Sequence, residues 1–254
     1  MSAGHTARLY VPGDSPLHRL APEAKLVAVI AFVIAVAVTP REAVPAFAID
    51  AAIVIVAMAV AGFGPRLVLV RLAVVLPFIT FAFLIPFIAG GEQVEVLGVS
   101  LSREGLWGTW NIIAKAALGA SASLLLAGTT PIPEILSGLG RLRVPPVLVA
   151  IVSFMFRYLD VIVDEMRRMR TAMTARGHDP RWLWQAKPIA SSAGALFVRS
   201  YERGERVHAS MLARGFTGTM PQLEQRRATG REWAAAAVVP TIALCAAIGG
   251  IILT

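Results

Sequence analysis

Five long apolar runs, separated by short polar or charged segments, constrain this chain more than any other feature. A helix needs about 20 mostly apolar residues to cross the hydrocarbon core of a bilayer. The runs lie at residues 26–38, 43–63, 67–89, 106–127 and 233–253. The first run is short and needs its flank, back toward Leu20, to reach that length. We therefore predict an all-α integral membrane protein with about five transmembrane helices.

Composition and local breaks agree with this assignment. Charged residues make up 16% of the 254 residues, whereas soluble domains carry about 25%. Pro77 and Pro86 interrupt the third run, which a membrane helix tolerates when neighbours satisfy the freed carbonyl groups. Asp50 is the one acid that we place inside a span. We expect Asp50, and Lys115 in the fourth run, to be structural, because one carboxylate cannot make a metal site and a charged lysine cannot coordinate a metal.

Charge is concentrated in one segment and predicts the orientation of the chain. Residues 128–231 contain 16 of the 24 Lys and Arg residues and 8 of the 16 acids, so the whole net charge of +8 lies there. Positive segments stay in the cytoplasm. We therefore expect N-terminal transmembrane helices in residues 1–127, a cytoplasmic coupling-helix region in 128–231 and a C-terminal transmembrane helix in 232–254. The N-terminus is predicted inside the cell and the C-terminus outside.

The charged segment contains the same short motif twice. Met173-Thr174-Ala175-Arg176-Gly177 recurs 38 positions later as Met211-Leu212-Ala213-Arg214-Gly215. A glycine after the last periodic residue ends a helix, and an arginine in the last turn favours the negative end of the helix dipole. One copy would be an ordinary helix end. Two copies on one charged segment between membrane spans favour a docking function for the two ends.

The first of these helices begins with an apolar run at residues 144–156, which is too short to span a bilayer before Arg157. We expect it to enter the membrane partway or to lie in the interface, and then to continue as a charged helix to Arg176. Met166, Met169 and Met173 follow at helical spacing. Such a methionine stripe suits either a surface that repacks against a partner or packing between two helices of this protein.

The second helix is predicted from about Ile189 to Arg214. One face carries Ala193, Phe197, Tyr201, Gly204, His208 and Met211. Arg199, Arg203, Arg206 and Arg214 fall in an arc on the other side, flanked by Glu202 and Glu205. Such a basic arc is typical of a solvated or headgroup-facing surface, but its end in the second Ala-Arg-Gly motif favours a docking helix. A nucleic acid partner is not expected, because no aromatic stacking pattern accompanies the basic residues.

Several kinds of chemistry have no motif here. The chain has no phosphate-binding Gly-x-x-x-x-Gly-Lys-Ser/Thr sequence and no His-Glu-x-x-His, and its histidines lie outside the predicted spans. We therefore expect no catalytic residue, no metal site and no cofactor on this chain. From the residues alone, two function classes also fit the predicted spans, besides a membrane protein that docks a partner through its two helix ends. One is a self-contained secondary transporter or channel, and the other is a membrane enzyme using Asp160, Asp164 and Glu165.

These motifs resemble the transmembrane T component of energy-coupling factor (ECF) transporters. The two Ala-Arg-Gly helix ends are the most specific part of the resemblance, which covers essentially the whole chain. The sequence 199–206 leading into Met211–Gly215 is most similar to the CbiQ branch, which serves cobalt and nickel uptake. Further matching pieces are His18-Arg19-Leu20 through Lys25, Ser102-Arg103-Glu104-Gly105, and Thr130-Pro131-Ile132-Pro133-Glu134.

The resemblance implies a function for each part. Two ABC-type ATPase subunits would each receive one helix end on the cytoplasmic side, and ATP and Mg²⁺ would be bound by them alone. A small substrate-binding membrane protein, the S component, would carry the substrate. The implied coupling residues are Ala175, Arg176, Gly177, Ala213, Arg214 and Gly215, supported by Met173, Arg199, Glu202, Arg203, Arg206 and Met211. An arginine at a helix end suits this task, because its planar fork makes bidentate pairs with carboxylates.

Overall fold

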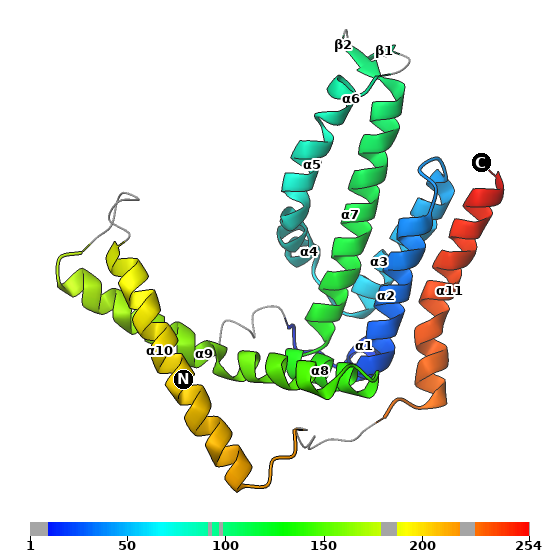
Figure 1. The fold of residues 1–254 in the computed structure, drawn as a ribbon. Coiled ribbons are helices and arrows are strands. Elements are labelled where there is room, and N and C mark those ends of the chain that lie inside the picture. The colour runs from blue at the N-terminus through cyan, green and yellow to red at the C-terminus, as the bar shows by residue number, and fades with distance from the viewer. Residues whose placement is uncertain (1–9, 91–92, 97–98, 179–186, 219–226, 254) are drawn as a thin grey trace. The chain divides into compact units, whose positions relative to one another are not determined.

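The computed structural model describes residues 10–90, 93–96, 99–178, 187–218 and 227–253. Two compact units account for the chain (Figure 1). One comprises residues 8–141 and 226–254 and is called the membrane unit here. The other, called the coupling unit, comprises residues 142–225 together with residues 1–7, which lie outside the described residues. Each unit is described by itself.

The membrane unit is built from helices with one small hairpin. Its elements are α1 (Pro16–Arg19), α2 (Pro22–Val38), α3 (Val44–Val60), α4 (Pro65–Leu72), the 3₁₀ turn η2 (Ala73–Val75), α5 (Leu76–Ala82), α6 (Ile85–Ile88), β1 (Gln93–Val96), β2 (Val99–Ser102), α7 (Arg103–Thr129), α8 (Ile132–Arg141) and α11 (Gly230–Leu253). Proline lies in the first turn of α2, α3 and α4. Proline is favoured there because its missing N–H would be unpaired in any case.

The predicted fold class is confirmed. Within the described residues, four helical segments are long and apolar enough to cross a membrane: Pro65–Ile88, Arg103–Thr129, Pro146–Ala175 and Gly230–Ile252. Val44–Val60 is a shorter apolar helix, and α2 covers the first predicted run. The protein is a multi-pass membrane protein.

Two details differ from the sequence prediction. The run at 144–156 was expected to be too short to span, but it is the first part of the uninterrupted 30-residue helix Pro146–Ala175, which meets the length and composition of a span. The loop predicted at residues 90–104 contains an antiparallel hairpin, in which Gln93 pairs with Ser102 and Val96 with Val99. Ser102 then begins α7, because its hydroxyl accepts a hydrogen bond from the amide of Gly105.

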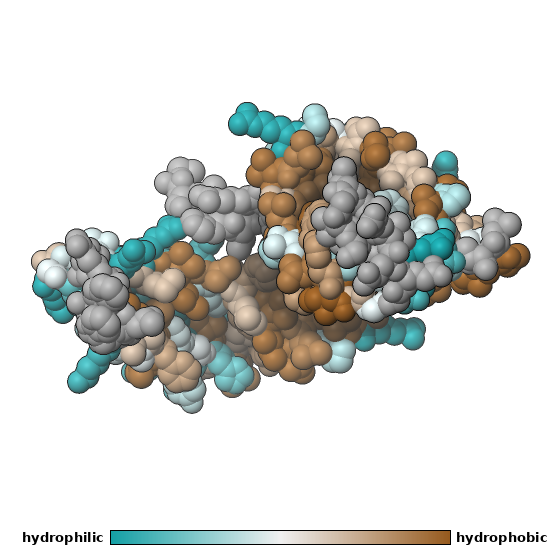
Figure 2. All heavy atoms as spheres, turned by 90° about the horizontal axis from the view of Figure 1, so that it is seen from above, coloured by the Kyte–Doolittle hydropathy of each residue, from teal (hydrophilic) through white to brown (hydrophobic). Residues whose placement is uncertain are grey.

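The core of the membrane unit lies between α2, α3, α7 and α11. α2 packs against α7, α8 and α11, and α3 packs against α7 and α11. Buried residues include Phe32, Phe47, Met58, Leu118 and Ala243. The outward-facing side chains of these helices are largely apolar, and hydrophobic side chains cover much of the surface in Figure 2. A bilayer can solvate such a surface, whereas water would not.

The third run is helical in pieces, and the breaks follow its prolines. Pro77 and Pro86 stand in the first turns of α5 and α6, so the helix restarts at each of them. Pro77 frees the carbonyl of Ala73, which accepts from the amide of Leu76 instead. Pro86 frees the carbonyl of Ala82, which accepts at 2.8 Å from the hydroxyl of Thr109 on α7. A neighbouring helix therefore satisfies the freed carbonyl, as bilayer surroundings require.

Lys25 fixes the junction between α7 and α8. Its side chain is buried, and Nζ donates to the Thr130 hydroxyl at 2.9 Å, to the Thr129 carbonyl at 3.3 Å and to the His18 carbonyl at 3.2 Å. Three oxygen acceptors use all three donors of an ammonium group. The first turn of α2 is thereby tied to the end of α1 and to the end of α7, just before α8 begins.

Polar groups inside the spans are few. Asp50 is fully buried, and within the described residues neither carboxylate oxygen has a hydrogen-bond partner. Lys115 donates to the carbonyl of Ala37 at 2.8 Å, joining α7 to α2. The contact gives Lys115 a structural role. The structural role predicted for Asp50 stays a prediction.

We predict that Thr109→Val lowers stability by roughly 1–2 kcal/mol, because the Ala82 carbonyl then lacks its donor in a dry environment. Thr80→Val is the matched control, since that hydroxyl bonds the Leu76 carbonyl of its own helix and is exposed. Apparent Tm in lipid nanodiscs measures both. Equal Tm values for the two variants would contradict the proposed role of Thr109.

We predict that Gly105→Ala is also destabilising. An added Cβ would lie 2.6 Å from the Pro86 Cα, so the backbone of α6 would have to shift. Overpacking of this kind costs about 1–3 kcal/mol. Gly119→Ala on the same helix meets no atom within 4 Å and should be neutral or slightly stabilising. A Gly105→Ala protein as heat-stable as Gly119→Ala would show that α6 does not pack closely on α7.

Candidate coupling site

The first Ala-Arg-Gly motif closes α9 (Pro146–Ala175) with a Schellman turn. The amide of His178 donates to the Met173 carbonyl at 3.0 Å, and the amide of Gly177 donates to the Thr174 carbonyl at 3.0 Å. Gly177 has φ +76°, a left-handed conformation that glycine adopts without strain. Arg176 lies within this turn, immediately before Gly177.

The second motif closes α10 (Lys187–Ala213) in the same way. Phe216 donates to the Met211 carbonyl and Gly215 to the Leu212 carbonyl, both at 3.0 Å. Gly215 has φ +81°. The predicted left-handed glycine is therefore confirmed at both ends. The repeat in the sequence is a repeat in backbone structure, with Arg214 placed in its turn as Arg176 is in the other.

The residues of the two motifs are available to a partner. All six are exposed: Ala175, Arg176, Gly177, Ala213, Arg214 and Gly215. Met173 and Met211, each three residues before the arginine, are half-buried. Within the described residues, no ion pair involves Arg176 or Arg214. The helices thus present two cations on rigid turns, with methionines on the inner side.

α9 and α10 cross and contact one another (Figure 1), and this helix pair is called the hairpin here. One acid on α9 pairs with a residue of each helix. Glu165 pairs with Arg199 of α10 at 2.6 Å and with Arg168 of its own helix at 2.9 Å. These residues lie in the charged half of α9. Of the predicted supporting residues, Arg199 therefore holds the hairpin together.

The face of α10 that contacts α9 is offset by one residue from the face on which the sequence places Ala193, Phe197 and Tyr201. Its half-buried side chains are Ser192, Leu196, Ser200, Arg203, Val207 and Met211. The predicted apolar face is largely exposed, with Phe197 and Tyr201 exposed by 72% and 60%. Small serines allow close helix approach, and Ser192 donates to the sulfur of Met173 at 3.4 Å. Small residues and an ion pair thus lie at the contact between α10 and α9. A hydrophobicity pattern registers neither of them.

The other supporting residues differ in how far their side chains are exposed. Arg203 is half-buried toward α9, whereas Arg206 and Glu202 are exposed and lie 3.9 Å apart. Such an exposed pair contributes little to stability. The methionine stripe is divided too, since Met169 is half-buried and Met166 is 53% exposed.

An open cleft of about 740 Å³ lies in the coupling unit beside the second motif. Four arginines line it: Arg157, Arg203, Arg206 and Arg214. Phe154, Tyr158, Met211 and Phe216 supply apolar and aromatic wall. The cleft therefore combines positive charge with an apolar surface, which suits an acidic and partly apolar segment of another protein.

Two of the three acids considered for an enzyme are paired with arginines. Asp164 lies 3.4 Å from Arg167, and Glu165 forms the pairs described above. Asp160 is exposed. In the part of the chain that the structure describes, no group of three or more His, Cys, Asp or Glu side chains could hold a metal ion.

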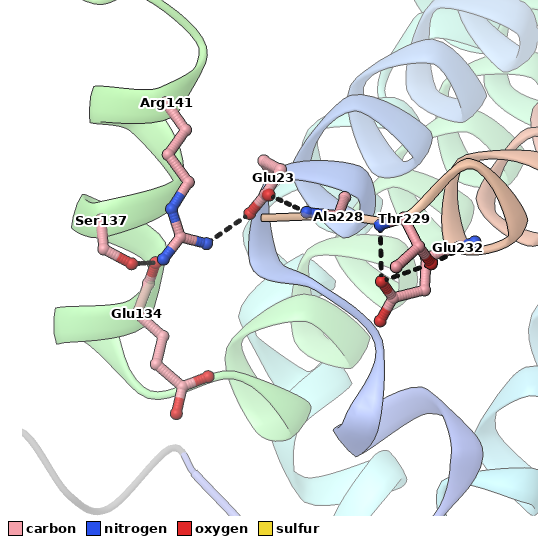
Figure 3. Close-up of polar contacts among 7 residues, drawn as sticks. All are labelled: Glu23, Glu134, Ser137, Arg141, Ala228, Thr229 and Glu232. Atoms are coloured by element: carbon pink, nitrogen blue, oxygen red, sulfur yellow. Dashed lines mark hydrogen bonds and ion pairs between the residues drawn. The ribbon is translucent and has the colours of Figure 1, made fainter. Parts of the chain in front are cut away.

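Sequence reasoning missed a buried cluster at the start of α2 (Figure 3). Glu23 accepts from Arg141 of α8 at 2.9 Å and from the amide of Ala228 at 2.7 Å. The available signal was the presence of two charged residues, Glu23 and Lys25, at the start of an otherwise apolar helix. Buried charges are rare unless they are paired.

Comparison with known proteins identifies the family. The CbiQ family model, described as cobalt transport protein, matches residues 13–224. The cobalt transport protein CbiQ of Rhodobacter capsulatus is 32% identical over 137 residues, which are 54% of this chain and 56% of that protein. A putative fused cobalt transport protein CbiMQ of Methanocorpusculum labreanum is 26% identical over 224 residues, 83% of this chain and 36% of that protein. The chain thus spans about half, or less, of the length of these two relatives.

A second group of relatives is matched over more of its length. The energy-coupling factor transporter transmembrane protein EcfT of Bacillus selenitireducens is 28% identical over 225 residues, which are 82% of each chain. The match to the family model includes both helix-end motifs, the cleft beside the second motif and Glu23. With a family match over most of its residues, the chain belongs to the CbiQ family and is a CbiQ-like transmembrane T component of the ECF transporter class.

Proposed function

We propose that this chain couples ATP hydrolysis by two ABC-type ATPase subunits to the movement of a separate substrate-binding membrane protein. The observation that carries the proposal is the identical closure of α9 and α10 by Schellman turns that expose Arg176 and Arg214. Two such ends on one hairpin can engage the two subunits of an ATPase dimer. When the dimer closes, the hairpin moves as a lever between them.

The chemistry of the two ends supports this task. A guanidinium group on a fixed turn can pair with a carboxylate through two parallel hydrogen bonds. Exposed Arg176 and Arg214 have no competing ion pair within the described residues. The arginine-lined cleft beside Arg214 adds three more cations and an apolar wall. We infer that the ATPase partner presents acidic side chains to these ends.

The resemblance to the family supports a proposal for the substrate and the remaining partners. We propose cobalt or nickel ions as the transported substrate, supported by the description of the family and by relatives named cobalt transport protein. ATP and Mg²⁺ would be bound by the ATPase subunits, and the metal ion by a small S component. The chain would lie in the cell membrane with its N-terminus and the charged ends of α9 and α10 in the cytoplasm and its C-terminus outside, as its concentrated positive charge favours.

We predict that Arg176→Ala and Arg214→Ala each weaken ATPase binding and that the double variant abolishes transport. Truncating one side of a desolvated charge pair costs roughly 2–5 kcal/mol. Lysine at either position should restore binding only in part, because it lacks the planar fork. Pull-down of the ATPase subunits and metal uptake in vesicles measure the effect.

Arg170→Ala is the control for these variants, since Arg170 is exposed on α9 but lies outside the motif. It should bind the ATPase subunits normally. Normal copurification of the ATPase with the Arg176→Ala/Arg214→Ala double variant would remove the docking role.

We predict that Gly177→Val and Gly215→Val reduce coupling more than the alanine variants do. An added Cβ meets no atom within 4 Å at either position, so the cost comes from positive φ alone. A β-branched residue is strongly disfavoured there. The arginine before the glycine would then be aimed elsewhere, and stimulated ATP hydrolysis should fall while membrane insertion is retained.

Gly204→Val is the matched control. Gly204 lies within α10, also has open space around its Cβ position and has no positive φ. Coupling at the wild-type level in both motif valine variants would mean that the two glycines only stop their helices.

A further inference from the structure

Glu23 occupies an unusual place in the chain. It lies in the first turn of α2, and only 5% of its side chain is exposed. One carboxylate oxygen accepts from Arg141 Nη1 at 2.9 Å, and the other accepts from the backbone amide of Ala228 at 2.7 Å (Figure 3). Each oxygen thus binds a different segment of the chain.

Those two segments are the connections to the coupling unit. Arg141 is the last residue of α8 and the last residue of the membrane unit before residues 142–225. Ala228 follows soon after the chain returns to the membrane unit at residue 226. A single buried carboxylate therefore holds the chain both where it leaves the membrane unit and where it comes back.

Both connections are stiff on the side of the membrane unit. α8 lies close against α2, since a Cβ on Gly138 would come within 3.1 Å of the Glu23 amide nitrogen. α11 begins with a capping box, in which the Thr229 amide donates to Glu232 at 2.8 Å and the Glu232 amide donates to the Thr229 hydroxyl at 3.4 Å. The segments that Glu23 binds are thus parts of rigid helix ends.

We infer that Glu23 is a positioning residue that clamps both connections of the coupling unit onto α2. The contacts of Glu23 with Arg141 and with Ala228 are called the two arms of the clamp. While both arms are formed, a displacement of either connection also moves α2 and the other connection. With an arm broken, α8 or the start of α11 can move without α2. The cause of any displacement of the coupling unit depends on the proposed function. The clamp itself is a property of this chain and does not.

The two arms differ in chemistry, which makes them separable. Arg141→Ala removes the guanidinium and leaves the Ala228 amide bound. Glu23→Leu removes both arms. Exchange of the pair, Glu23→Arg with Arg141→Glu, restores an ion pair but leaves the Ala228 amide without an acceptor, because arginine has none. A role limited to general stability predicts no such separation.

The experiment measures distances between pairs of spin labels by electron spin resonance, in full-length chain in lipid nanodiscs. Cys245→Ala removes the one native cysteine. Labels at Ile30 and Ser137 report the α8 arm, and labels at Ile30 and Arg231 report the α11 arm. Labels at Ile30 and Ile112 lie within the bundle and are the control pair.

We expect Glu23→Leu to broaden both arm distances and to leave the control pair unchanged. Breaking a buried charge pair should shift the equilibrium between the fixed and the displaced position of an arm roughly 100-fold. Arg141→Ala and the exchanged pair should affect the two arm distances differently. The first should broaden only the α8 distance, and the second should restore the α8 distance but not the α11 distance. Unchanged arm distances in Glu23→Leu, or broadening of all three pairs in both Glu23→Leu and Arg141→Ala, would overturn the clamp.

A second measurement connects the clamp to coupling. In the complex with its ATPase subunits, we expect Glu23→Leu to bind them normally but to transport fewer substrate ions per ATP hydrolysed. An unchanged transport ratio would overturn the positioning role. If wild-type chain binds no ATPase, the proposed function fails, while the distance measurements, which need no partner, still decide the clamp.

Discussion

A bilayer offers no water to backbone groups, and that constraint explains how the membrane unit is held together. Every carbonyl freed inside a span needs a donor from the protein. Pro77 and Pro86 free the carbonyls of Ala73 and Ala82, and these are met by the Leu76 amide and the Thr109 hydroxyl. The second donor comes from α7. The broken helix α4–α6 is therefore tied to α7 by a hydrogen bond that its own sequence makes necessary, and α7 also packs on α2 and α3.

The sequence predicts what depends on local chemistry. Within the described residues, apolar runs located three of the four helices that are long enough to cross a membrane. The glycines after Arg176 and Arg214 located the ends of α9 and α10 together with their left-handed turns. Proline positions located the breaks in the third span. These features are set by residues within one or two helical turns of one another, so one sequence contains enough information to find them.

What the sequence did not predict depends on contacts between distant segments. The face of α10 that meets α9 is offset by one residue from the face at Ala193, Phe197 and Tyr201. Ser192 and Ser200 lie on the face that meets α9, and Arg199 beside it pairs with Glu165. Glu23 binds residues 118 and 205 positions away. Periodicity carries no information about such partners. A charged residue at the start of an apolar helix does indicate that a partner exists, without naming it.

The two helix ends are alike in backbone and unlike in surroundings, and this difference has a mechanical consequence. Arg214 lines a cleft with three other arginines and an aromatic wall, whereas Arg176 ends its helix outside the residues that line that cleft. Under the proposed function, the two ATPase subunits would therefore meet two dissimilar ends, one beside the basic cleft and one outside it. An acidic partner would meet four cations at the cleft, and its attraction to them would grow where water is excluded. Under the proposed function, a closing movement would then be applied unequally to α9 and α10, and the helix pair would turn as well as shift. A turning movement is what a coupling subunit needs if it is to tilt a neighbouring membrane protein.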